Sequence, residues 1–293
     1  MAEASGLKVL KSRKPNCMQT SSLGAGELIK DAIYRGAKEI ILGIGGSATN
    51  DAGMGIASAL GYRFTGYNDE VLQPIGENLV HVANIESKNV LSELANVRFL
   101  VACDVQNLFY GNDGASYVYA PQKGATPHQV KLLDIGLRQF SSVLFKKFGK
   151  DVQTIKGAGA AGGVGGGSIC FLNAELISGI EMILKFAQFS DKIKGADFII
   201  TGEGLIDIQT SSGKTIKGIV SRAKKENIPV IAMCGSSMLT EEQQQTLGVD
   251  CVFCIQKGVT DLQFAIQNTS ANLEYTAFNF ASLIQSINKN TRN

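Results

Sequence analysis

"DFIITGEGLIDIQTSSGKTIKGIVSRAKKENIPVIAMC" (residues 197–234) holds two apolar runs separated by a helical pattern. The runs at 197–201 and 229–234 are nearly continuous in apolar residues, which is typical of strands covered on both faces. The pattern at 212–226 indicates a helix, with Thr210 or Ser212 as its cap. A strand, a helix and a second strand in this order predict a parallel β-α-β unit.

The downstream sequence extends this unit. It predicts a helix near 240–246, a strand at 250–255 and a final helix at 261–287. The result is a Rossmann-like β-α-β-α-β arrangement, half of a doubly wound domain, and its sheet would be small with three strands. Upstream, strands are expected at 39–44 and 97–103, and helices at 26–37 and 127–148.

We therefore expect an α/β protein of two α/β domains. Residues 1–190 would form a glycine-rich domain that carries substrate and phosphate loops. Residues 191–293 would form the Rossmann-like domain, and a glycine-rich cleft would separate the two. The boundary is placed near residue 190, where the longest glycine stretches end and the regular alternation begins.

Bulk composition narrows the function classes. The 293 residues carry a net charge of +2, which shows no bias toward nucleic acid, and contain no apolar run that could span a bilayer. Six scattered cysteines predict a reduced, cytoplasmic protein. Cys251 and Cys254 form C-x-x-C inside an apolar run, so buried strand cysteines are expected rather than a redox pair.

The Gly-Lys-Thr at 213–215 resembles the end of a phosphate-binding P-loop. That loop requires glycine where this chain has Ile208, so the P-loop interpretation fails. Glu203 and Asp207, just past the expected strand, could hold Mg²⁺ or accept a proton from an alcohol. Lys214 would add a positive charge nearby. The alternative is a capped helix with a solvated lysine.

A glycine-rich turn at 43–55, "GIGGSATNDAGMG", follows the strand at 39–44. Gly45 and Gly46 would let backbone N–H groups converge on an anion. The cap of the next helix would be Ser47, Thr49, Asn50 or Asp51. The alternative is a tight strand-to-helix turn with no ligand.

A polar segment, 103–125, follows the strand at 97–103. Asp104 stands at the strand end, where open parallel sheets place ligand-binding residues, and Asn107 and Lys123 lie further along. The alternative is a polar connecting loop.

The richest glycine stretch, "GAGAAGGVGGGS" at 157–168, predicts a loop packed closely against the 43–51 loop, with Gly162 and Gly163 at the contact. A flexible linker is the alternative.

Together these segments supply anion cradles, carboxylates and lysines, which are the parts that phosphoryl transfer needs. Residues of a nucleophilic triad are lacking, because histidine is nearly absent. The dinucleotide fingerprint is also incomplete, since no acid stands at a strand end about 20 residues after the glycine turn. A dinucleotide-dependent oxidoreductase is therefore disfavoured.

Four blocks, "GIGGSATNDAG", "CDVQNLFYGNDGASYVYAPQKGAT", "GAGAAGGVGGGSICFLNAELISGIE" and "DFIITGEGLIDIQTSSGKT", resemble the signature blocks of bacterial type I glycerate kinases. The resemblance implies ATP-dependent phosphorylation of D-glycerate with Mg²⁺ in the cytoplasm, most often to 2-phosphoglycerate and less often to 3-phosphoglycerate. Matched to these blocks, the expected catalytic residues are Asp104, Asp207 and Lys214, and the expected metal ligands are Glu203 and Asp207. The expected substrate or phosphate contacts are Gly45, Gly46, Ser47, Asn50, Asp51, Asn107, Lys123, Gly162, Gly163 and Glu203.

The sequence departs from the family pattern at three places. Family members usually begin with a segment containing "DSFKG" and "DGGEG", and neither is present here. Leu205 replaces a frequent arginine, and Ala52 replaces a frequent glycine. We therefore expect a shortened member with an incomplete C-terminal sheet, lower turnover and a tendency to form homo-oligomers; a non-catalytic homologue is the alternative.

Overall fold

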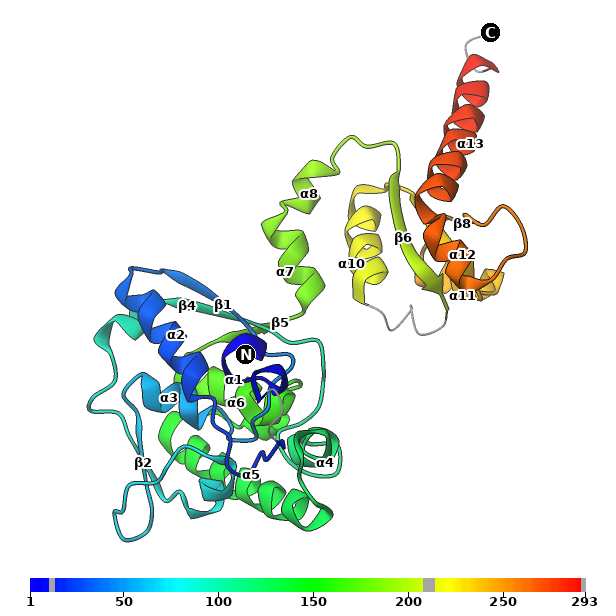
Figure 1. Cartoon of the computed structure of the whole chain (residues 1–293). Helices are drawn as coiled ribbons and strands as arrows, with labels where there is room; N and C mark the ends of the chain where they lie inside the picture. Colours follow the sequence, from blue (N-terminus) through cyan, green and yellow to red (C-terminus); the bar gives the residue numbers. More distant parts are fainter. Residues whose placement is uncertain (11–13, 208–213, 291–293) are drawn as a thin grey trace. The chain divides into compact units, whose positions relative to one another are not determined.

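The computed structural model describes residues 1–10, 14–207 and 214–290, so Ile208, Thr210, Ser212 and Gly213 lie outside the described residues. The chain divides into two compact units, Met1–Gly179 and Ile180–Asn293. The boundary expected near residue 190 lies inside the second unit, in α8 (Phe189–Lys192). Figure 1 shows both units as α/β structures.

The first unit contains a parallel sheet. Its strands are β1 (Glu39–Gly43), β4 (Arg98–Ala102) and β5 (Glu175–Ile177), in the order β1-β4-β5. The apolar runs had predicted β1 and β4. A separate antiparallel pair joins β2 (Arg63–Thr65) to β3 (Asn84–Glu86). Because the strands of the larger sheet run the same way, the segments that follow them leave from one edge.

The helices of the first unit are labelled in Figure 1. The longest, α5, begins at a capping box in which Thr126 and Gln129 exchange side-chain and backbone hydrogen bonds, and it ends at Gly149 with φ 68°. The α-helices are α1 (Ala2–Ser5), α2 (Leu23–Tyr34), α3 (Met54–Ala59), α4 (Ala115–Tyr119), α5 (Pro127–Phe148) and α6 (Ala160–Phe171). The short 3₁₀ turns are η1 (Leu7–Leu10), η2 (Gly76–His81), η3 (Ser92–Asn96), η4 (Pro121–Lys123) and η5 (Val152–Thr154).

The prediction of a loop at 157–168 was wrong, because most of this stretch is the buried helix α6. Its start is kinked, with left-handed backbone at Ala161, Gly162 and Gly163. Glycine costs helix propensity, but here a side chain would collide with neighbouring backbone. A Cβ on Gly167 would lie 2.0 Å from the carbonyl oxygen of Ala52. Tertiary crowding, which local propensity does not reveal, therefore selects glycine in this helix.

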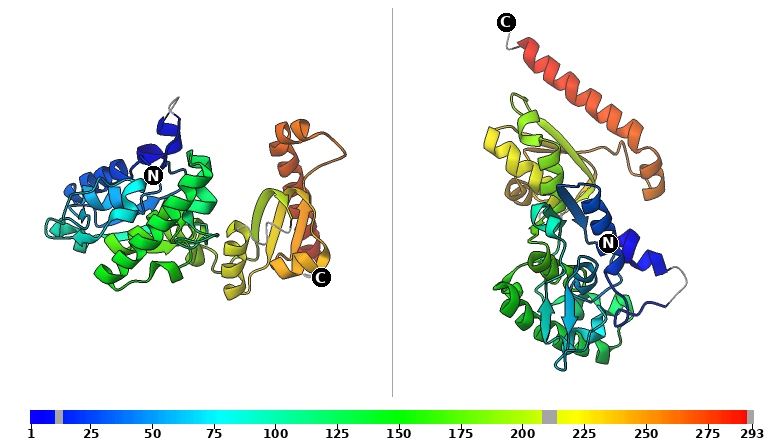
Figure 2. Two further views of the ribbon diagram at one scale, coloured as in Figure 1. Left: turned by 90° about the horizontal axis from the view of Figure 1, so that it is seen from below. Right: turned by 90° about the vertical axis from the view of Figure 1, so that its left-hand side faces the viewer.

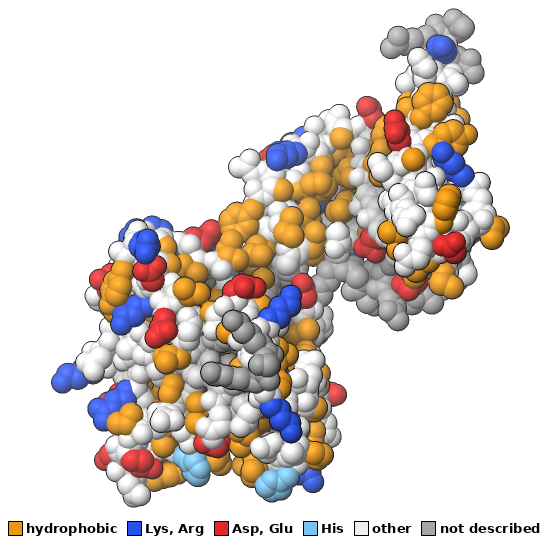
Figure 3. Space-filling model, viewed as in Figure 1, with side chains coloured by type: hydrophobic (Ala, Val, Ile, Leu, Met, Phe, Trp, Pro, Cys, Tyr) orange, Lys and Arg blue, Asp and Glu red, His pale blue; other side chains and the backbone are white. Residues whose placement is uncertain are grey.

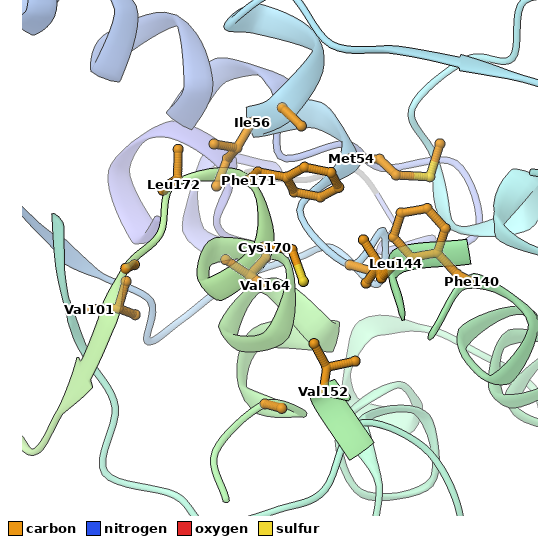
Figure 4. Close-up of a cluster of buried hydrophobic side chains, with 14 of the residues drawn as sticks. Met54, Ile56, Val101, Phe140, Leu144, Val152, Val164, Cys170, Phe171 and Leu172 are labelled. Carbon is orange, nitrogen blue, oxygen red and sulfur yellow. The ribbon is translucent and has the colours of Figure 1, made fainter. Parts of the chain in front are cut away.

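The main core of the first unit forms around the end of α6. The ring centroid of Phe171 lies 5.7 Å from that of Phe64 and 6.3 Å from that of Phe140. Figure 4 shows Phe171 facing Met54 and Ile56 of α3. These side chains are almost completely buried. The glycine face of α6 thus meets backbone while its apolar end fills the core, which fixes the helix between the 49–53 segment and α5.

The second unit is the expected β-α-β-α-β arrangement. Strands β6 (Ile199–Ile206), β7 (Val230–Ser237) and β8 (Cys251–Cys254) form a parallel sheet in that order. Figure 2 shows this sheet from two further sides, with the long C-terminal helix in red. The helices are α7 (Gly179–Phe186), α8, α10 (Lys214–Ala223), α11 (Glu241–Leu247), α12 (Leu262–Gln267) and α13 (Thr269–Asn290), with the 3₁₀ turn η6 (Lys224–Glu226).

Three details of the second unit differ from the sequence prediction. Strand β6 extends to Ile206, so Glu203 lies within the strand rather than just past it. The single helix expected at 261–287 is divided at Asn268, whose amide nitrogen donates to the carbonyl oxygen of Phe264. Cys251 and Cys254 are exposed rather than buried. They lie on β8, an edge strand of the described sheet, and the apolar run alone does not reveal edge position.

Strand β6 forms the opposite edge of this sheet, and some of its apolar side chains are exposed to solvent. Ile200 is 47% and Leu205 is 45% exposed, although central β7 is buried from Val230 to Cys234. Figure 3 shows hydrophobic side chains on the surface of the second unit. Phe278 of the last helix is 65% exposed. Exposed edges and apolar surface favour association, but homo-oligomer formation stays a prediction.

Gly167→Ala should destabilise the first unit by roughly 1–3 kcal/mol, because the new Cβ collides with rigid backbone at Ala52. Gly43→Ala is the matched control, since a Cβ there would meet no atom within 4 Å. Urea unfolding followed by circular dichroism measures both. Equal stability of the two variants would contradict the packing constraint assigned to α6.

Candidate functional site

An open cavity of about 450 Å³ lies at the edge of the first unit's sheet where the strands end. Its lining includes Gly45, Gly46 and Ser47 from the segment after β1, Asp104 after β4, and Lys123 at the end of η4. Five of the residues singled out in the sequence therefore surround one cavity. Ligands of open parallel sheets bind at this carboxyl edge, so the cavity is the candidate functional site of the unit.

Lys123 provides the positive charge of the cavity. Its side chain is only 2% exposed, and Nζ donates to Ser47 Oγ at 2.9 Å and to the carbonyl oxygen of Thr49 at 2.7 Å. Burial lowers the pKa of Lys123 from 10.5 to about 8, although negative charge on Cys17 and Asp51 favours its charged form. The lysine therefore ties η4 to the glycine turn, and its remaining proton can bind an anion.

Asp104 provides the negative charge. Its carboxylate borders the cavity, and Oδ1 accepts a hydrogen bond from the backbone N–H of Gly179 at 3.1 Å. Gly179 is the first residue of α7, so the contact is that of a helix cap. Asp104 thus combines exposure to the cavity with an anchored orientation, as a group that receives a proton requires.

Asn107 and Tyr119 form a small network beside Asp104. The Tyr119 hydroxyl donates to Asn107 Oδ1, and Asn107 Nδ2 donates to the carbonyl oxygen of Asp113 at 2.9 Å. Burial and the nearby Cys103 raise the pKa of Tyr119, which keeps its hydroxyl neutral. Tyr119 lines the cavity and was missed in the sequence. Its position, an aromatic residue in the polar segment 103–125 shortly before Lys123, was the feature of the sequence that could have indicated a role at the site.

Asp51 lies fully buried behind the glycine turn. Its oxygens accept hydrogen bonds from the N–H and Oγ of Ser22, at 2.7 and 2.8 Å, and from the N–H groups of Gly53 and Gly55, at 3.1 and 3.2 Å. Burial raises its pKa, while these hydrogen bonds act in the opposite direction. The carboxylate therefore braces the start of α3, and a direct ligand contact by Asp51 stays a prediction.

Asn50 is also fully buried, and its Nδ2 donates to Ser116 Oγ at 3.3 Å. Within the described residues, Asn50 Oδ1 and Thr49 Oγ1 are buried without a hydrogen-bond partner. The turn that holds Lys123 thus also carries two acceptor atoms that nothing in the described structure satisfies. Binding of a ligand by Asn50 stays a prediction.

Gly162 and Gly163 hold α6 against this turn. A Cβ on Gly162 would lie 2.2 Å from the carbonyl oxygen of Thr49, and one on Gly163 would lie 3.0 Å from Cα of Ala52. The N–H of Ala52 donates to the carbonyl oxygen of Gly162 at 3.0 Å. The expected packing of 157–168 against the 43–51 loop is therefore confirmed. Neither glycine lines the cavity.

The remaining candidates belong to the second unit. Glu203 is half-buried in β6, and Asp207 is half-buried directly after that strand. α10 begins at Lys214, whose side chain lies outside the described structure. Across the described ranges, no three His, Cys, Asp or Glu side chains converge as a metal site would need. Asp104 and Asp207, both expected to be catalytic, belong to different units, and their joint role stays a prediction.

Parallel sheets with charged groups at their carboxyl edges place the chain among ligand-binding α/β proteins. Comparison with known proteins gives the family. The family model described as "Glycerate kinase family" matches residues 1–285, and the chain belongs to that family of kinases.

Individual relatives agree with this assignment. The chain is 44% identical over 291 residues to a glycerate kinase of Halalkalibacterium halodurans, covering 99% of this chain and 76% of the relative. It is 37% identical over 284 residues to a glycerate 2-kinase of Escherichia coli K12, covering 97% and 74%. A crystal structure assigned as glycerate kinase 2 of Salmonella typhimurium LT2 matches with a TM-score of 0.83 at 37% identity, covering 98% of this chain and 75% of that one.

Asp51→Asn should lower the unfolding free energy by about 3 kcal/mol. The amide offers one acceptor oxygen where the carboxylate offers two, and its NH₂ group would face donors, so buried N–H groups lose their partners. Asp31→Asn, at an exposed pair with Arg35, is the control and should cost under about 1 kcal/mol. Similar unfolding midpoints in urea for both variants would contradict the bracing role of Asp51.

The pH dependence of stability should reveal Lys123. Its pKa of about 8 in the folded chain lies below the unfolded value of 10.5, so between these values the unfolded chain binds a proton that the folded chain has lost. The unfolding free energy of the wild type relative to Lys123→Met should therefore rise with pH across this window, by up to about 1.4 kcal/mol per pH unit. Exposed Lys156, changed to methionine, is the control. A flat difference for Lys123→Met would show that the lysine titrates normally.

Proposed function

We propose that this chain catalyses ATP-dependent phosphorylation of D-glycerate to 2-phosphoglycerate. The observation that carries the proposal is the cavity in which Lys123, Ser47 and Asp104 meet, in a chain of the glycerate kinase family. Similarity to a relative named glycerate 2-kinase supports position 2 over formation of 3-phosphoglycerate.

The anionic part of a ligand is assigned to Lys123 and the glycine turn. Lys123 Nζ has used two of its three donors within the protein, on Ser47 and Thr49. A Cβ on Gly45 would meet no atom within 4 Å, so open space borders this backbone, as a cradle for a phosphate or carboxylate requires. The burial of Lys123 strengthens its attraction for an anion.

The hydroxyl of glycerate must lose a proton as it attacks the phosphoryl group. Asp104 is the base that we favour in the first unit. Its carboxylate borders the cavity, and the N–H of Gly179 donates to Oδ1 and so fixes its orientation. Asp207 is the corresponding carboxylate of the second unit, and Lys214 would stabilise charge on the transferred group. Asn107, Asn50, Asp51, Gly162 and Gly163 would then maintain the shape of the first-unit site.

The residues present fit ATP and Mg²⁺ in chemistry. Glu203 and Asp207 are hard oxygen donors, and Mg²⁺ in nucleotide sites is usually held by one or two carboxylates plus phosphate oxygens. When bound, Mg²⁺ would neutralise charge on the phosphates. These assignments belong to the proposal.

A cytoplasmic location is also part of the proposal. Over the ranges that the structure describes, every helix is too short or too polar to cross a bilayer. The reduced state of all six cysteines is consistent with a location in the cytoplasm.

Coupled ADP release by the purified chain, with D-glycerate, ATP and Mg²⁺, tests the proposal directly. We expect turnover, with ³¹P NMR identifying 2-phosphoglycerate as the product. Release of 3-phosphoglycerate would overturn the position, and ATP binding without turnover would favour a non-catalytic homologue. L-glycerate is the substrate control.

Asp104→Asn should lower kcat by at least ~10², because the amide keeps the acceptor oxygen for Gly179 but cannot take a proton. Asp113→Asn, an exposed aspartate of the same segment, should leave kcat within about twofold, as surface substitutions remote from the chemistry do. Steady-state kinetics at pH 7 measure both. Equal kcat values for the two variants would remove Asp104 from the reaction.

A further inference from the structure

Two cysteines face each other across the parallel strands of the second unit. Cys234 of β7 is the register partner of Cys254 of β8, and their sulfur atoms are 4.0 Å apart. Cys234 is 1% exposed, whereas Cys254 is exposed and lines an open cavity of about 350 Å³. One thiol of the pair is therefore open to a dissolved reagent and the other is protected.

This pair differs from the C-x-x-C motif in the sequence. Cys251 and Cys254 are three residues apart on β8, and side chains alternate along a strand, so they point to opposite faces of the sheet. Register partners in neighbouring strands share a face, which places Cys234 beside Cys254. The partner for Cys254 is thus on another strand.

The backbone already provides the spacing that a disulfide needs. Neighbouring strands lie about 4.8 Å apart, inside the Cα separation of about 4.4–6.8 Å found across disulfides. The two sulfur atoms would have to approach from 4.0 Å to about 2.05 Å, which rotation of the side chains supplies in large part. A bridge between directly opposed strand positions would be somewhat strained, and strained bridges are the readily reduced ones.

We propose that Cys234 and Cys254 are a modification site, in which hydrogen peroxide converts the two thiols to a reversible disulfide. The Cys254 sulfur attacks peroxide, the O–O bond breaks, and a sulfenic acid and one water form. The Cys234 sulfur then displaces the sulfenic oxygen, which leaves with the Cys234 proton as a second water. The two sulfurs together lose two electrons, and peroxide gains them.

The environment of the thiols sets this order of steps. Cys234 is 1% exposed, whereas Cys254 is exposed, so peroxide reaches the Cys254 sulfur first. The Cys234 sulfur lies 4.0 Å from the Cys254 sulfur and 3.7 Å from the carbonyl oxygen of Phe253. It is therefore held beside the sulfur atom that peroxide reaches first.

The bridge would lie beside a candidate ligand residue. Glu203 of β6 is the register partner of Cys234, so Glu203, Cys234 and Cys254 form one row across the sheet. The proposal itself does not depend on the proposed function, because the bond can be detected without any measurement of turnover.

The test treats the full-length chain with a small excess of hydrogen peroxide, alkylates the remaining thiols in denaturant, and maps disulfides by non-reducing peptide mass spectrometry. We expect the alkylatable thiols to fall from six to four, with one Cys234–Cys254 linked peptide pair that dithiothreitol removes. Cys251→Ser is the matched control, an exposed cysteine on the same strand, and should form the same linked pair.

Cys254→Ser should abolish the linked pair and leave Cys234 alkylatable, because the protected thiol lacks its reactive partner. Cys254 is exposed, so this variant should fold, and circular dichroism checks that it does. Two results would overturn the proposal. One is full alkylation of both cysteines in the treated wild type. The other is a Cys254 bridge to Cys251 or to a second copy of the chain.

Discussion

The first unit depends on a close approach between two pieces of backbone. The N–H of Ala52 donates to the carbonyl oxygen of Gly162, and the carbonyl oxygen of Ala52 leaves no space for a side chain on Gly167. Ala52 itself has φ 53°, a left-handed conformation that side chains disfavour. This contact fixes the turn after β1. The same turn provides Ser47 and Thr49, which accept hydrogen bonds from Lys123.

Two buried charges support that turn from opposite sides. Asp51 receives four hydrogen bonds from the segment at 22 and from the start of α3, and Lys123 donates to Ser47 and Thr49. The negative charge of Asp51 favours the ionised form of Lys123. Burial of a charged side chain costs free energy unless hydrogen bonds satisfy it. The hydrogen bonds to Asp51 and from Lys123 therefore offset the cost of burying the two charges. Lys123 Nζ thus has two acceptors within the protein and one remaining N–H, and the lysine lines the cavity.

The sequence predicted those features that depend on local pattern. Apolar runs located β1, β4 and the three strands of the second unit, and helical spacing located α5. It failed where tertiary contacts override propensity: α6 is helical despite its glycines, and Glu203 lies in a strand that continues through Gly202 and Gly204. The rule that ligand-binding residues follow the ends of parallel strands placed Asp104 correctly at the sheet edge. The burial of Asp51 and the position of Tyr119 at the cavity depend on contacts between residues distant in sequence.

Among the residues that the structure describes, each unit has a hydrophobic core drawn from its own residues. The Phe171 core uses residues before Gly179, and the core around Val230 and Ala232 uses residues after Ile180. Cooperativity of unfolding follows from shared burial, so two separate cores make two cooperative blocks in one polypeptide. A calorimetric scan of such a molecule contains two overlapping transitions rather than one. A single melting temperature would then average two stabilities, and a small molecule held by one block would shift only that block's transition.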